Sequence, residues 1–169
     1  MAQEMQYDAS GEAELMKAIW APVISDNPYK FVMLVFPWGK ANTPLAKFKG
    51  PRKWQKDILL EIAGHIEKNR VKEANKAMMD VMRMAVSSGR GIGKSALVSW
   101  LILWMISTRI GSTTIVSANS EAQLRSVTWG ELTKWQAMMV HSHWFEISAT
   151  KLAPAPAESR LDIDRFIPL

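Results

Sequence analysis

Residues 82–106 read MRMAVSSGRGIGKSALVSWLILWMI, and this stretch decides the fold expected for the chain. The apolar run at 82–87 is typical of a short buried strand, and the glycine-rich turn after it leads into a strongly apolar helix at 96–106. A strand, a glycine-rich loop and a helix in this order are the local signature of a phosphate-binding loop. The rest of the sequence is therefore interpreted around this unit.

The loop complies with the pattern G-x-x-x-x-G-K-[ST] at seven of its eight positions, and the one departure is a serine at the first glycine. Glycine adopts backbone conformations that other residues avoid, so the three loop glycines allow N–H groups to turn inward around phosphate oxygens. The nucleotide-binding residues predicted from the motif are Ser88, Gly89, Arg90, Gly91, Ile92, Gly93, Lys94 and Ser95.

Two side chains of this loop have chemical roles in the prediction. Lys94 is placed to reach the terminal phosphates, and the Ser95 hydroxyl to ligate Mg²⁺ beside them. The positive N-terminus of the following helix favours a bound anion. The simpler alternative is a glycine-rich turn that caps a helix, with Lys94 as a solvated cation. The strand-like run before the loop and the helix after it favour nucleotide binding.

Composition limits the class of protein. The chain has 169 residues, 48% of them hydrophobic, which is enough for a packed domain. It has no cysteine, its N-terminus lacks the pattern of a signal peptide, and its apolar run at 96–106 is too short to span a membrane. We therefore expect a cytoplasmic protein. Lysine and arginine outnumber acids by 21 to 16, which is compatible with a polyanionic partner, but no run of basic residues forms an obvious nucleic-acid stripe.

An amphipathic helix is predicted after Pro51, with an apolar stripe at Ile58, Leu59, Ile62 and Ile66. Its Gln55 falls on the apolar face. A buried amide needs hydrogen-bond partners, which makes Gln55 a candidate for reading a planar heterocycle, whereas the simpler alternative is that it caps the helix or meets solvent at its edge.

Downstream of the loop, the β-branched run at 113–116 is typical of a buried strand. Ser120 and Gln123 form a capping-box pair that opens another helix, which extends to about Val140. Strands and helices that alternate in this way predict an α/β fold with parallel strands. We expect an N-terminal extension at 1–50 with one helix, a partial P-loop core at 51–150 and an irregular tail at 151–169. His141 and His143 lack carboxylate or cysteine partners nearby in the sequence, so no metal site is expected there.

Three sequence motifs together resemble those of large terminase subunits from tailed bacteriophages and prophages. The loop at 87–95 is similar to that family's phosphate loop, whose first position is often not glycine. Pro51-Arg52-Lys53-Trp54-Gln55 looks like its upstream adenine motif, and residues 115–123 are similar to its next motif, a strand and turn. The resemblance covers about residues 50–150.

The resemblance implies a RecA-like ATPase core that binds ATP and Mg²⁺ and pumps DNA into a procapsid. Gln55 would read adenine, and Arg90 would stabilise charge during phosphoryl transfer, the alternative being a solvated arginine. The implied partners are double-stranded phage DNA, a portal protein and a small terminase subunit, and a homo-oligomer is compatible with the resemblance. No membrane partner is implied.

The chain departs from the family in ways that weaken the prediction of an enzyme. No acidic pair follows an apolar strand after Gln123; Asp162 and Asp164 lack the preceding apolar run. The family's coupling motif and nuclease domain are also missing, so the resemblance implies the front part of a motor, able to bind ATP but incomplete for hydrolysis. Two alternatives stay open: a non-enzymatic assembly or DNA-binding fragment, and another P-loop DNA-dependent ATPase of the helicase type.

Overall fold

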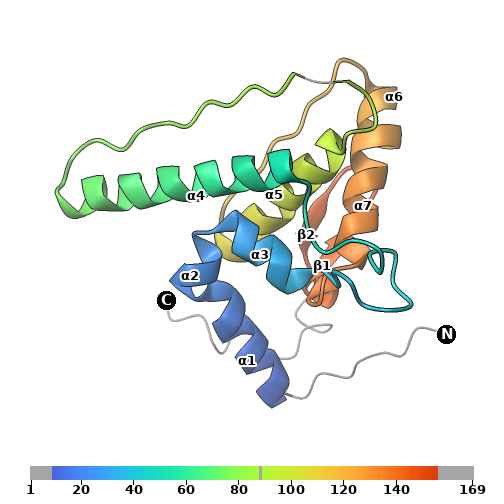
Figure 1. Cartoon of the computed structure of the whole chain (residues 1–169), viewed down its shortest axis with the longest axis horizontal. Coiled ribbons are helices and arrows are strands. Elements are labelled where there is room, and N and C mark those ends of the chain that lie inside the picture. Colours follow the sequence, from blue (N-terminus) through green and yellow to red (C-terminus); the bar gives the residue numbers. More distant parts are fainter. Residues whose placement is uncertain (1–8, 88, 156–169) are drawn as a thin grey trace.

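The computed structural model describes residues 9–87 and 89–155 (Figure 1). Its helices are α1 (Ala9–Trp20), α2 (Pro22–Ser25), α3 (Pro28–Val35), α4 (Lys53–Ala74), α5 (Lys94–Thr108), α6 (Glu121–Gln123) and α7 (Gly130–Ala137). A π-helical segment, Leu124–Trp129, joins α6 to α7, and a 3₁₀ turn, Ser142–Trp144, leads into the strands β1 (Phe145–Ile147) and β2 (Leu152–Pro154). These two strands form an antiparallel hairpin in which Glu146 lies opposite Ala153.

The predicted α/β class is wrong. The described part of the chain is mostly helical, and its one sheet is the hairpin of β1 and β2, so the parallel sheet of a RecA-like core is not there. The two runs predicted as parallel strands, 82–87 and 113–116, are both extended loop. Figure 1 shows the segment that contains the first run (green) returning above α4 to the start of α5.

The physical reason is that neither run has a neighbouring strand among the described residues. The backbones of 81–87 and 113–119 make no hydrogen bond to any other described residue, and Ile115 is 88% exposed. β-branched and apolar residues favour a strand only where adjacent strands accept their backbone hydrogen bonds and other elements cover their faces. Both runs therefore have residues that favour a strand, but no neighbouring strand in the described part of the chain accepts their backbone hydrogen bonds.

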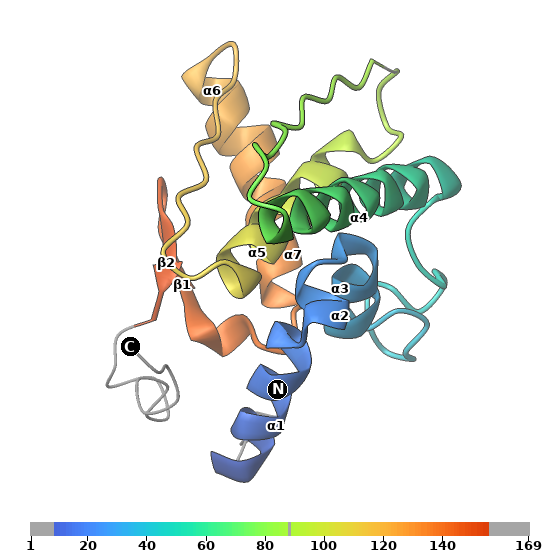
Figure 2. The ribbon, with the colours of Figure 1, turned by 90° about the vertical axis from the view of Figure 1, so that its left-hand side faces the viewer.

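Helix α5 is the centre of the core, as its apolar sequence predicted. Its buried residues are Ala96, Leu97, Ser99, Trp100, Ile102, Leu103, Trp104 and Ser107. Figure 2 shows α5 with α4 beside it and α7 behind it. A helix that is apolar around its circumference needs cover on several faces, and α1, α3 and α7 all contact it.

Four aromatic rings pack together where α5, α7 and the end of α3 meet: Trp100, Trp135, Phe36 and Trp38. Trp100 meets Trp135 edge-on with ring centroids 4.9 Å apart, and it lies 5.8 Å from Trp38. Phe36 meets Trp135 edge-on at 5.0 Å. Aromatic pairs in this geometry add stabilisation beyond that of the area they bury.

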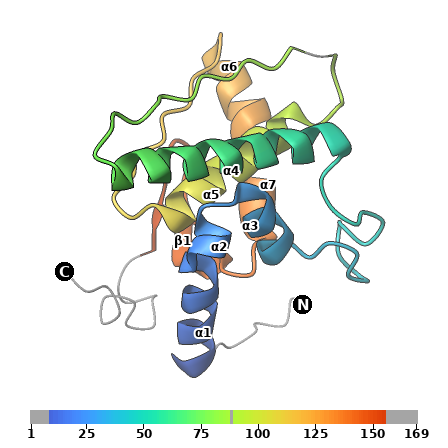
Figure 3. The ribbon, with the colours of Figure 1, turned by 60° about the vertical axis from the view of Figure 1, so that its left-hand side comes forward.

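The described residues before α4, 9–52, belong to this same core. The apolar run at 31–36 is helical up to Val35 as part of α3. Asn27 caps that helix by accepting a hydrogen bond from the Lys30 N–H. Met16 and Ile19 of α1 and Phe31 of α3 pack in one cluster with residues of α5 and α7. Figure 3 shows α1, α2 and α3 stacked beneath α4 and α5. Within the described residues, no helix combines the length and apolar character needed to cross a membrane.

Candidate phosphate-binding loop

The glycine-rich loop lies directly before α5, as predicted. Gly91 has φ of +75° and Gly93 has φ of +91°, values in the left-handed region that other residues rarely adopt. Gly93 is the N-cap residue of α5. Two of the three loop glycines therefore have the backbone conformation for which the motif requires glycine. Ser88, the first position of the motif, lies outside the described residues.

The start of α5 provides an electropositive end beside this loop. Because the cap is a glycine, no side chain caps the N–H groups of the first helical turn. Lys94 and Ser95 form this turn and are half-buried, and the Lys94 ammonium folds back to donate a hydrogen bond to the Gly89 carbonyl, with Nζ 2.9 Å from the oxygen. The N-terminus of α5 and the Lys94 ammonium therefore both lie beside the glycine-rich loop.

Gln55 of α4 joins that helix to the loop. Its Nε2 donates to the Gly93 carbonyl at 2.9 Å, and its Oε1 accepts from the Arg52 N–H at 2.9 Å, so the side chain also caps α4. Gln55 is only 3% exposed. The sequence placed this amide on the apolar face of its helix, which is confirmed, but the protein partners that satisfy it became visible only in the structure. The reading of adenine by Gln55 stays a prediction.

The glycine-rich loop has one open side and one packed side. A Cβ atom added at Gly89 or Gly91 would meet no atom within 4 Å, whereas one added at Gly93 would lie 2.8 Å from Gln55 Nε2. One side of the loop is therefore open, and the other rests against α4. Arg90 lies at the open, exposed side, where a guanidinium can approach a bound phosphate.

Ser95 is the one side chain predicted to ligate a metal, and it lies within the described residues. Within 9–87 and 89–155 no group of three or more His, Asp or Glu side chains is arranged to hold a metal ion. Asp162 and Asp164 lie outside the described residues. The Ser95 hydroxyl, in the first turn of α5, fits a magnesium ion that takes its other ligands from water and nucleotide phosphates, as such ions commonly do.

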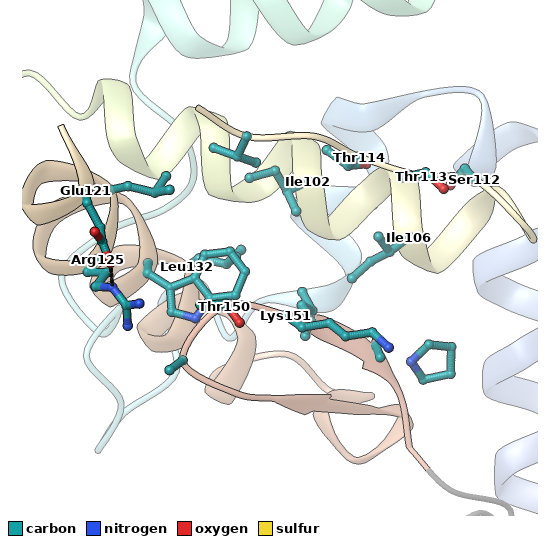
Figure 4. Close-up of a pocket in the computed structure, with 17 residues that line it drawn as sticks. Ile102, Ile106, Ser112, Thr113, Thr114, Glu121, Arg125, Leu132, Thr150 and Lys151 are labelled. Atoms are coloured by element: carbon teal, nitrogen blue, oxygen red, sulfur yellow. Dashed lines mark hydrogen bonds and ion pairs between the residues drawn. The ribbon is translucent and has the colours of Figure 1, made fainter. Parts of the chain in front are cut away.

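A cavity of about 560 Å³ lies away from this loop, between α5, the extended segment at 112–116, the π-helical segment and the hairpin (Figure 4). Ile102 and Ile106 of α5 form its floor, Lys151 lies at the hairpin side, and the Glu121–Arg125 ion pair lies at one end. Among the described residues, none of those predicted to bind nucleotide lines this cavity.

Sequence analysis missed two buried polar clusters around the histidines. Glu12 of α1 is buried, its Oε1 lies 2.6 Å from His143 Nε2, and its Oε2 accepts a hydrogen bond from the Trp144 indole at 2.8 Å. His141 is fully buried and hydrogen-bonded to the Ser107 hydroxyl at 2.8 Å. Burial, and next the neighbouring His143, lower the pKa of His141 to about 3. Partners more than thirty positions away in the chain leave no signal in sequence spacing.

Comparisons of this chain with protein-family models, with curated proteins and with solved structures return no match.

Proposed function

We propose that residues 89–95 bind the phosphates of ATP together with Mg²⁺, and that the chain is the nucleotide-binding part of a DNA-packaging motor of the terminase type. The observation that carries the proposal is the left-handed Gly93 at the N-cap of α5, which leaves the first helical turn without a side-chain cap beside Lys94. The proposal concerns nucleotide binding within a mostly helical fold. Its partners are double-stranded DNA, a portal protein and a small terminase subunit, in the cytoplasm of a bacterial host.

Three side chains of the loop and the first turn of α5 contact the nucleotide in the proposed binding mode. Lys94 exchanges the Gly89 carbonyl for a phosphate oxygen, since a charged acceptor forms the stronger hydrogen bond. The first turn of α5 donates N–H groups to the same anion. Bound Mg²⁺ would neutralise charge on the phosphates, and Ser95 Oγ would be its protein ligand. Arg90 would hold the outer phosphate oxygens from the exposed side of the loop.

Replacing Lys94 with alanine is expected to weaken binding of a non-hydrolysable ATP analogue by about tenfold to a hundredfold, the loss of one or two charge-assisted hydrogen bonds. Isothermal titration with Mg²⁺ present measures this. Lys68→Ala is the matched control, because it removes the same charge from an exposed position on α4. Equal affinities in wild type and Lys94→Ala would overturn the proposal.

Replacing Gln55 with alanine distinguishes two roles for this residue: holding the loop in place through hydrogen bonds, and recognising adenine. Since both ends of the amide already bond to the chain, we expect Gln55→Ala to weaken binding of ATP and of inorganic tripolyphosphate alike, by about fivefold to tenfold for one lost hydrogen bond. An adenine reader would lose affinity for ATP while tripolyphosphate binding stayed unchanged. Titrating both ligands into wild type and variant distinguishes the two roles.

A further inference from the structure

The positive charge of this protein is concentrated in one short segment. Residues 40–56, called here the basic segment, contain six cations and no acid, whereas acids outnumber cations by 16 to 15 over the rest of the chain. The whole net charge of +5 therefore comes from seventeen consecutive residues. The cations are separated by other residues, which is why no basic run is evident in the sequence. They are Lys40, Lys47, Lys49, Arg52, Lys53 and Lys56.

All six cations are exposed, and few are neutralised. Lys53 pairs with Asp57 at 2.8 Å on the open surface, where such pairs contribute little. Lys56 lies over the Tyr29 ring, 5.1 Å from its centroid. Lys40, Lys47 and Lys49 form no ion pair with any described residue. Their charge remains available to an external partner.

The loop that carries these three lysines is held in place. The Gly39 N–H donates to the Leu45 carbonyl at 3.1 Å, and the Leu45 side chain is buried in the core. The Trp38 indole donates to the Val32 carbonyl at 2.9 Å, and the Thr43 hydroxyl donates to the Lys40 carbonyl at 2.8 Å. A fixed loop presents its cations without paying the ordering entropy that a free chain would lose on binding.

The remaining three cations lie at the start of α4, where the helix itself disfavours them. Positive charge at a helix N-terminus opposes the helix dipole, and acidic residues are the usual choice there. The first turn of α4 has none. Arg52 lies next to the phosphate-binding loop, with Nη1 3.5 Å from the Gly91 carbonyl. In Figures 2 and 3 the cyan loop hangs below the start of α4, on the side where α5 begins.

The residue types exposed on the basic segment favour a nucleic acid over a protein or a membrane as its partner. Protein interfaces are depleted in lysine and rich in apolar and aromatic anchors, and a membrane-surface segment needs an apolar face. In the basic segment one large apolar side chain is exposed, Phe48 at 54%. Clustered, exposed lysines and arginines match a phosphate backbone. A single aromatic provides no stacking platform for a run of unpaired bases, which favours a duplex.

We infer that the basic segment binds the phosphate backbone of double-stranded DNA beside the nucleotide loop. The choice of DNA over RNA rests on the proposed function, while the choice of a nucleic-acid backbone rests on charge alone. Binding is electrostatic and independent of base sequence, since lysines that contact phosphates carry no sequence information.

Fluorescence anisotropy of a short labelled DNA duplex, titrated with the full chain without nucleotide at several salt concentrations, tests this inference. Wild type is expected to show a slope of log K against log salt of about −4 to −5, from four to six phosphate contacts. Lys40→Gln/Lys47→Gln/Lys49→Gln is expected to reduce that slope by about 2–3 and to weaken binding about tenfold to a hundredfold. Lys17→Gln/Lys68→Gln/Lys76→Gln, also exposed, has the same net charge and is expected to bind like wild type.

Equal losses in the two triple variants would overturn the inference, because net charge rather than this surface would then govern binding. Tighter binding of single-stranded DNA that is lost in Phe48→Ala would overturn the assignment to a duplex, and preference for a duplex RNA would overturn the choice of DNA. A protein that fails to bind nucleotide but passes these tests would remove the proposed function and leave the inference standing.

Discussion

Replacing Trp100 with alanine is expected to lower the free energy of unfolding by about 3–5 kcal/mol, the usual cost of removing a large buried aromatic side chain. Trp100 is 2% exposed and lies among Trp135, Trp38 and Phe36, with which it makes close ring contacts. Alanine is the best helix former, so the loss comes from packing rather than from helix propensity. A domain of this size has about 5–15 kcal/mol in total, so the variant is expected to be close to unfolding at 37 °C.

Trp100→Phe is the matched control. The Trp100 indole nitrogen is buried without a hydrogen-bond partner among the described residues, so phenylalanine removes ring area but breaks no hydrogen bond. We expect a cost of about 1–2 kcal/mol, and denaturant unfolding followed by circular dichroism measures both variants. If Trp100→Ala were as stable as Trp100→Phe, the four-ring contact between α5, α7 and the end of α3 would not stabilise the fold.

Lowering the pH from 7 to about 4.5 is expected to reduce the free energy of unfolding by about 2–3 kcal/mol through His141 alone. The pKa of this buried histidine is lowered to about 3 in the folded protein, whereas an unfolded histidine titrates near 6.5. Between these two values the unfolded chain binds a proton that the folded protein does not. The contribution of neutral His141 to the free energy of unfolding is therefore fully present above pH 6.5. It is lost as the pH falls toward 3, at up to about 1.4 kcal/mol per pH unit.

His141→Gln tests the origin of this pH dependence. The glutamine amide does not titrate and keeps a group able to bond the Ser107 hydroxyl, which accompanies His141 in the core. The variant is expected to be less stable than wild type at pH 7, because the ring contacts with Phe31 and Trp144 are lost, but to lose less stability on acidification. Urea unfolding at a series of pH values gives both slopes. Parallel slopes would assign the effect to other groups.

Local patterns in the sequence predicted the features that depend on nearby residues. The glycines at 91 and 93 lie in the left-handed region that the motif requires. Helix α5 is buried, as its apolar composition indicates. Ser120 caps the next helix by accepting a hydrogen bond from the Gln123 N–H at 3.2 Å. Each of these features is set within a few positions along the chain, where spacing and residue type carry the information.

Predictions that required partners from elsewhere in the chain were less successful. The runs at 82–87 and 113–116 have the composition of strands but no neighbouring strand in the described structure. A strand is defined by its pairing, and pairing is a tertiary property. The excess of positive charge at 40–56 was present in the sequence, but the lysines are scattered and form no basic run. The structure was needed to show that they are exposed together on a fixed loop beside α4.

Short-range patterns in the sequence were enough to predict the glycine-rich loop, the helix that follows it and the burial of Gln55, because glycine conformation and helical periodicity act over a few residues. Long-range packing sets the partners of Gln55, brings Glu12 to His143 across 131 positions and leaves the strand-like runs unpaired among the described residues. Hydrogen bonds and buried charges are satisfied by whichever groups the fold brings within about 3 Å, and the spacing of residues along the chain does not reveal which groups these are.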